Sequence, residues 1–138
     1  MLNHKDTKAQ REEIPNGTNE AAAVVVDAAF AVHSTLGPGL LESVYEVCLA
    51  HELDKRGRQV RRQLSLPVVY DGVRLDAGLR LDMVIDDCVV VEIKAVEHLL
   101  PVHHAQVLTY LKLTGHRLGL LINFNTPLIK HGIRRVVL

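Results

Sequence analysis

The stretch VRLDAGLRLDMVI, residues 73–85, has the clearest alternation of apolar and polar residues in this 138-residue chain. Such alternation predicts a β-strand with one buried face, because successive side chains of a strand point to opposite sides. The residues expected on the buried face are Val73, Leu75, Ala77, Leu79, Leu81, Met83 and Ile85. Asp71 and Gly72, which precede the stretch, predict a two-residue hairpin turn from an earlier strand.

Apolar periodicity predicts the other elements. Helical spacing covers residues 19–36, 40–56 and 101–114. Strand patterns cover residues 60–70, 88–96 and 118–124, with one more short strand near 133–137. Pro67 cannot donate a ladder hydrogen bond, so it predicts an edge strand or a bulge. The order α-α-β-β-β-α-β, with an extra C-terminal strand, predicts an α/β fold.

The first two helices are each expected to bury one stripe of side chains. In the first helix, capped by Thr18 or Asn19, these are Val25, Ala28, Val32 and Leu36. In the second they are Leu41, Val44, Cys48 and Leu49. Residues 1–18 are polar and lack periodicity, which predicts a disordered tail ahead of a single domain at 19–138.

Composition limits the partners of this protein. Sixteen basic side chains balance sixteen acidic ones, so any polyanion must be held by a local patch. No apolar stretch approaches the roughly 20 residues of a membrane span, and the first residues lack the apolar region of a signal peptide. The expectation is a soluble, cytoplasmic protein that does not contact membranes.

Glu92 and Lys94 are two residues apart on a predicted strand, so their side chains share a face. Asp82 lies on the preceding strand, and its place depends on the turn after Ile85. A two-residue loop puts Asp82 and Glu92 on opposite faces of the sheet. A three-residue connection, which pairs Ile85 with Val89, puts Asp82 directly across from Glu92. A shared site therefore requires the longer, bulged connection.

Two carboxylates directly opposite each other on neighbouring strands repel each other unless a hard cation lies between them. Mg²⁺ takes oxygen ligands and is usually held by one or two carboxylates plus a phosphate. Such a site predicts a phosphoryl substrate, with Lys94 orienting or deprotonating the attacking water. Glu42, in the first turn of a helix, is a candidate third carboxylate. The alternatives are a solvated Glu-x-Lys pair and, for Glu42, a charge favoured by the helix dipole.

Several stretches together resemble one family. GLLESVY, residues 39–45, looks like the signature of the GxxExxY proteins, small bacterial proteins named for that motif. VEIKAV at 91–96, PVHHAQ at 101–106 and GLLINF at 119–124 resemble the rest of the family pattern. That family is grouped with the PD-(D/E)XK nuclease superfamily. The resemblance implies a restriction-endonuclease-like fold, a mixed β-sheet flanked by helices.

The resemblance also implies a metal-dependent nuclease that hydrolyses phosphodiester bonds in DNA or RNA with Mg²⁺ or Mn²⁺. Asp82 and Glu92 then correspond to metal ligands and Lys94 to the catalytic lysine. Glu42 corresponds to the helix carboxylate that completes or supports the site, and Gln106 to a helix residue that lines it. A non-catalytic module that binds nucleic acid or protein through the same face is the alternative.

Further side chains are expected around this site. Those expected beside the metal ligands or the substrate are Tyr45, His103 and Tyr110. A basic run lies at the end of the second helix and the start of the first strand, and it comprises Lys55, Arg56, Arg58, Arg61 and Arg62. These side chains either contact phosphates or form a solvated helix end. The strong apolar alternation is also compatible with a homodimer formed through an exposed sheet edge.

Overall fold

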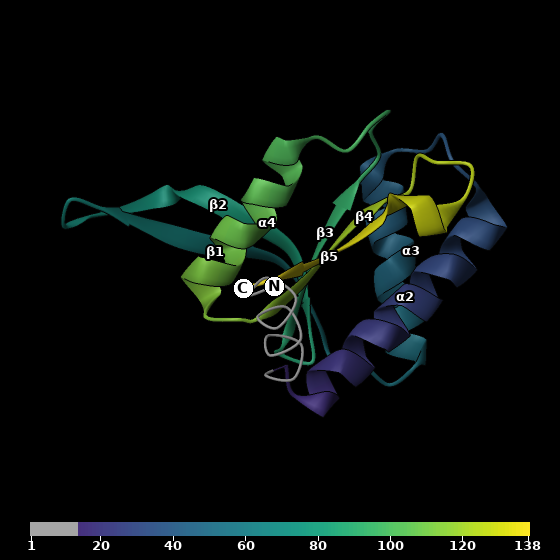
Figure 1. Ribbon diagram of the computed structural model, residues 1–138, viewed down its shortest axis with the longest axis horizontal. Helices are drawn as coiled ribbons and strands as arrows, with labels where there is room; N and C mark the ends of the chain where they lie inside the picture. The colour runs from purple at the N-terminus through teal and green to yellow at the C-terminus, as the bar shows by residue number, and fades with distance from the viewer. Residues whose placement is uncertain (1–13) are drawn as a thin grey trace, which may run out of the picture.

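A five-stranded sheet separates two layers of helices in the computed structural model of the protein, which describes residues 14–138 (Figure 1). The elements are α2 (Asn16–Leu36), α3 (Glu42–Lys55), β1 (Val60–Tyr70), β2 (Val73–Ile85), β3 (Val89–Lys94), α4 (Pro101–Thr114), β4 (Leu118–Asn123), the 3₁₀ helix η1 (Ile129–Gly132) and β5 (Ile133–Val137). The strand order is β1-β2-β3-β4-β5, and only β3 and β4 are parallel neighbours. The predicted α/β fold and its additional last strand are confirmed.

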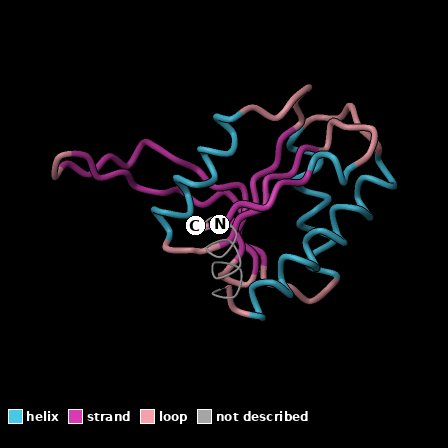
Figure 2. Tube along the Cα trace, viewed as in Figure 1, coloured by secondary structure: helices cyan, strands magenta, loops and turns pink. Residues whose placement is uncertain are grey.

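The sheet is covered by α2 and α3 on one face and by α4 on the other (Figure 2). We call these the α2/α3 face and the α4 face. On β3, Val89 and Val91 belong to the larger core cluster beneath α2 and α3, whereas Val90 belongs to the smaller cluster beneath α4. Glu92 and Lys94 follow Val90 in the alternation, so they lie on the α4 face.

Helix α2 begins earlier than its sequence pattern predicts. Its first residue is Asn16, and the carbonyl of Pro15 accepts a hydrogen bond from the N–H of Thr18 at 3.0 Å. Ile14 is only 3% exposed and packs into the core. Residues 14–18 therefore belong to the folded part rather than to the tail. The remaining tail residues, 1–13, lie outside the described part of the chain.

Helix α3 buries only part of the predicted stripe: Leu49 lies in the core and Cys48 packs against it, as predicted. Leu41 is 73% exposed and Val44 is also exposed, whereas the buried apolar residues are Tyr45, Leu49 and Leu53. The ring of Tyr45 stacks on that of Phe124, with centroids 4.6 Å apart. This contact turns the Tyr45 side of the helix towards the sheet, so the prediction for Leu41 and Val44 is wrong.

The hydroxyl of Tyr45 fixes the loop that precedes α3. It donates a hydrogen bond to the carbonyl of Gly37 at 2.6 Å and accepts one from the N–H of Leu40 at 3.1 Å. Gly37 and Gly39 have φ angles of 69° and 98°, which a side chain would disfavour. Gly39 and Tyr45 of the GLLESVY motif thus shape the loop that leads into Glu42, the first residue of α3.

Replacing Tyr45 by phenylalanine should destabilise the protein without altering its core packing. Two hydrogen bonds worth roughly 0.5–1.5 kcal/mol each are lost, so we expect a decrease of about 1–3 kcal/mol in the free energy of unfolding. Chemical denaturation measures it. Tyr70→Phe is the matched control, because Tyr70 is 74% exposed. Equal stabilities for the two variants would contradict the role of the hydroxyl.

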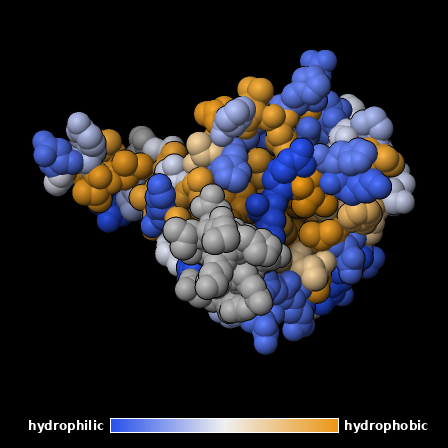
Figure 3. All heavy atoms as spheres, in the orientation of Figure 1, coloured by the Kyte–Doolittle hydropathy of each residue, from blue (hydrophilic) through white to orange (hydrophobic). Residues whose placement is uncertain are grey.

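Strands β1 and β2 form a long hairpin that projects beyond the helical layers (Figures 1 and 2). Its turn has positive φ at Asp71 and Gly72, as predicted. The strand pairing shifts between Leu66 and Val68, and β1 is an edge strand, which confirms the prediction from Pro67. The apolar side chains near the tip are exposed (Figure 3), and these are Val69, Tyr70, Val73 and Leu75. The prediction of one continuous buried face on β2 is wrong there, because no helix covers the tip.

The alternation of β2 is also interrupted at Asp82. Met83 packs in the core on the α2/α3 face, whereas Leu81 packs on the α4 face, although regular alternation would put both on one side. The partner strand changes faces at the same level, at Gln63, whose φ is 52°. Beyond this point Leu64 packs on the α4 face. Asp82 therefore lies where two paired strands exchange their faces.

Candidate active site

The turn between β2 and β3 has the register that a shared site requires. Ile85 pairs with Val89, so the connection comprises Asp86, Asp87 and Cys88. Asp86 and Asp87 have φ angles of 51° and 55°, and the N–H of Cys88 donates to the carbonyl of Ile85 at 3.0 Å. The expected three-residue connection is confirmed.

Asp82 and Glu92 lie where the ladder between β2 and β3 ends. The last paired residues are Met83 and Val91, and beyond them β2 diverges into the projecting hairpin (Figure 1). The N–H of Asp82 donates to Oε1 of Glu92 at 2.9 Å, and the N–H of Ile93 donates to Oδ2 of Asp82 at 2.7 Å. Each carboxylate thus replaces a backbone carbonyl as the acceptor and fixes the opposite strand.

Burial raises the pKa values of both carboxyl groups. Glu92 is 2% exposed, and loss of hydration, followed by repulsion from Asp82, raises its pKa to about 8. The pKa of Asp82 rises to about 6, again mainly through burial, although the hydrogen bond from Ile93 opposes the change. The charges of Glu46 and Glu42 raise it further. Because the two carboxyl groups repel each other when both are charged, a cation bound between them would compete with the proton that they hold.

The metal-free protein should become less stable as the pH rises from about 4 to about 8. In this range the native state holds more protons than the unfolded chain, whose carboxyl groups titrate near pH 4, so the stability falls with pH. Glu92→Gln removes most of this dependence. We expect the free energy of unfolding of the wild type, relative to Glu92→Gln, to be lower at pH 8 than at pH 5.

Urea denaturation in EDTA at several pH values tests this expectation. Glu97→Gln, at an exposed glutamate, serves as the matched control. A difference between wild type and Glu92→Gln that stays constant or grows with pH would rule out the raised pKa.

Lys94 is partly buried beside the two carboxylates. Its charge lowers the pKa values of Asp82 and Glu92, and it also opposes the rise in the pKa of Glu42 that burial produces. Among residues 14–138, however, its ammonium forms no ion pair within 4.0 Å. Lys94 is therefore close to the acidic groups and still available to a substrate or water.

Helix α4 brings Tyr110 and Gln106 towards the carboxylates. Burial, followed by the charges of Glu92 and Asp82, raises the pKa of Tyr110 to about 12, while a hydrogen bond with Gln106 opposes the change. The amide oxygen of Gln106 is buried and has no hydrogen-bond partner within the described residues. A buried acceptor without a donor costs free energy, so this atom marks a place where water or a ligand would be favoured.

Two of the side chains predicted around the site contact the backbone. Nδ1 of His103 accepts a hydrogen bond from the N–H of Leu100 at 3.0 Å, which caps the start of α4. The hydroxyl of Tyr45 is used by the loop before α3. Any contact of these two residues with a substrate stays a prediction.

Glu46 belongs to the site and was not predicted. It is buried and accepts hydrogen bonds from Nη2 of Arg62 at 2.7 Å and from Nε2 of Gln63 at 2.5 Å. It thereby holds the irregular residue of β1 that lies opposite Asp82. The sequence did contain a signal, because Glu46 follows Glu42 by four residues and shares its side of the helix.

The predicted phosphate-contacting residues all pair with carboxylates of the protein. Lys55 and Arg56 contact Glu52, Arg58 contacts Asp86 and Glu20, Arg61 contacts Asp87, and Arg62 contacts Glu46. Most of these pairs have at least one exposed side chain, which limits the stability they contribute. The basic run therefore forms no single unpaired patch, and its role in phosphate binding stays a prediction.

The pair Asp82 and Glu92 fits a hard divalent cation. Among the described residues no group of three or more His, Cys, Asp or Glu side chains converges to hold an ion. Mg²⁺, however, is usually bound by one or two carboxylates, with waters and substrate phosphate as the other ligands. The backbone bonds use Oδ2 of Asp82 and Oε1 of Glu92, and the two carboxyl groups also share a side-chain hydrogen bond, whose proton a bound cation would displace. A direct contact from Glu42 stays a prediction.

The chain belongs to the PD-(D/E)XK nuclease superfamily, because the family model of that description matches residues 19–136. Nucleases of this superfamily generally use divalent metals. Searches of curated proteins and of solved structures give no significant match. Within residues 14–138, no helix has the length and apolar character needed to cross a membrane.

Proposed function

We propose that the protein is a metal-dependent nuclease that hydrolyses phosphodiester bonds in DNA or RNA. The observation that supports this function best is the reciprocal anchoring of Asp82 and Glu92, with Lys94 beside them and in no ion pair with any residue of 14–138. Carboxylates that are each hydrogen-bonded to the neighbouring strand can keep their positions when a substrate binds. Hydrolysis requires catalytic groups with such a fixed geometry. The superfamily fold supports the same conclusion.

Mg²⁺ or Mn²⁺ held by Asp82 and Glu92 would polarise the phosphoryl group and lower the pKa of water. The protein's own side chains have separate tasks. Lys94 orients or deprotonates the attacking water and offsets the negative charge that grows on the phosphate. Gln106 offers to the same water its amide oxygen, which accepts no hydrogen bond from residues 14–138. Tyr110, whose pKa is raised to about 12, stays protonated at neutral pH and can donate a hydrogen bond.

Cleavage of single- and double-stranded DNA and RNA in Mn²⁺ tests the proposal. We expect Asp82→Asn and Lys94→Ala each to lose about 10²-fold or more in rate, because each removes a group that acts in the transition state. Asp76→Asn, on the exposed part of β2, and Lys112→Ala, on the surface of α4, are the matched controls. Cleavage that persists in both site variants would refute the assignment.

Metal binding can be measured without cleavage. A cation that binds only the folded state increases the free energy of unfolding, by about 2.7 kcal/mol when its concentration is a hundred times Kd. The melting temperature rises as a result. We expect Mn²⁺ to stabilise the EDTA-treated wild type and Asp76→Asn, but not Asp82→Asn. A wild type that binds nucleic acid without any response to metal would favour the non-catalytic module.

A further inference from the structure

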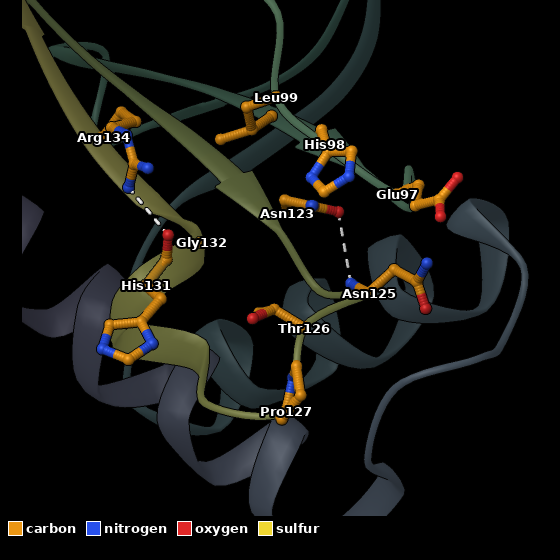
Figure 4. Close-up of a pocket in the computed structure, with 10 residues that line it drawn as sticks. All are labelled: Glu97, His98, Leu99, Asn123, Asn125, Thr126, Pro127, His131, Gly132 and Arg134. Atoms are coloured by element: carbon orange, nitrogen blue, oxygen red, sulfur yellow. Dashed lines mark hydrogen bonds between the residues drawn. The ribbon is translucent and has the colours of Figure 1, made fainter.

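A polar pocket of about 360 Å³ lies at the carboxyl ends of the parallel strands β3 and β4 (Figure 4). Ligands of open α/β sheets commonly bind outside the carboxyl ends of the strands. The lining residues that matter here are His98, Asn123, Thr126, His131 and Arg134. None of them was predicted to take part in the active site.

The sheet register aligns this pocket with the candidate active site. Glu92 pairs with Leu121, which in turn pairs with Arg134, so the three lie in one row across β3, β4 and β5 on the α4 face. Strands are about 4.8 Å apart, which places the backbones of Glu92 and Arg134 about 10 Å apart. Lys94 pairs with Asn123, which lines the pocket. The two sites therefore share one surface.

The wall of the pocket is held by hydrogen bonds of the buried Asn123. Its Oδ1 accepts from the N–H groups of Val96 at 3.0 Å and Asn125 at 3.2 Å, and its Nδ2 donates to the carbonyl of Val96 at 2.9 Å. These bonds join the loops that follow β3 and β4. Gly132 packs so closely that an added Cβ would lie 2.2 Å from the carbonyl oxygen of Asn123. The pocket is thus formed before any ligand binds.

Arg134 gives the pocket a group that can bind an anion. Nη1 of Arg134 donates to the carbonyls of His131 at 2.8 Å and Ile133 at 3.1 Å, which holds the guanidinium at the rim and leaves its other donors for a ligand. His98 lies across the pocket from Arg134, and the carboxylate of Glu97 points away from the centre (Figure 4). An arginine fork with an imidazole on the opposite side favours phosphate.

We propose that this pocket binds a backbone phosphate of the nucleic-acid strand whose scissile phosphate lies at Asp82, Glu92 and Lys94. The proposal rests on the proposed function and extends it to the flanking part of the substrate. Because the two sites lie about 10 Å apart, a substrate must carry a second phosphate beside the scissile one to occupy both. The pocket therefore sets a minimum substrate length.

Arg134→Gln and Arg135→Gln form a matched pair of variants. The two residues are neighbours and lose the same charge, but Arg135 lies on the α2/α3 face, where it bonds Asn19. The measurement is fluorescence anisotropy of a labelled single-stranded oligonucleotide in Mg²⁺, on the Lys94→Ala background so that it is not cleaved. We expect Arg134→Gln to reduce the slope of log K against log salt by about 0.7, and Arg135→Gln to leave it unchanged.

Two further measurements make the outcome decisive. A dinucleoside monophosphate carries a single phosphate and cannot occupy both sites at once, so it should bind the Lys94→Ala protein with and without Arg134→Gln equally. Arg134 also bonds the backbone near η1, so its replacement could lower stability, and His98→Ala is therefore the second variant. The His98 side chain forms no hydrogen bond in the described residues. Its loss should weaken binding without lowering the melting temperature.

The possible failures can be told apart. Equal salt slopes for the two arginine variants, in a protein whose wild type cleaves, would overturn the pocket and leave the nuclease function intact. A wild type that neither binds nor cleaves nucleic acid would overturn both proposals.

Discussion

The backbone hydrogen bonds accepted by Asp82 and Glu92 determine how β2 meets β3. From Met83 to Ile85, β2 pairs with β3 in a regular ladder. On the other side of Asp82 the two strands separate, and β2 continues into the long hairpin. Burying two acids side by side raises their pKa values and lowers stability near neutral pH. The two acids lie at the level where β1 and β2 change faces, and the backbone hydrogen bonds fix their geometry there.

Much of the fold could be predicted because the local signals agreed with one another. Pro101 and Gly115 delimit α4 at both ends, and Asp71 with Gly72 forms the predicted turn. Helix α3 was harder, because its sequence contains two adjacent apolar stripes. The choice between them depends on the stacking of Tyr45 on Phe124, a contact between distant parts of the chain that no local pattern contains.

The site was predictable only where it depends on spacing. The two-residue step from Glu92 to Lys94 gave their common face, and the register argument brought Asp82 to Glu92. The support from Glu46 depends on a positive φ at Gln63, and glutamine carries no sequence signal for that conformation. Arg134 was missed for another reason, since its relation to Glu92 exists only once β4 pairs with both neighbours.

The irregularity at Gln63 also bears on solubility. An exposed edge of eleven residues with apolar side chains is a template for aggregation through strand addition. In β1, the positive φ of Gln63 and the missing donor of Pro67 divide that edge so that no uninterrupted stretch exceeds three residues. A homodimer built on this edge would meet the same obstacle. A substitution that gave residue 63 the extended conformation of a regular strand would therefore create a longer edge able to pair with other chains. The same change would displace Asp82, which lies opposite.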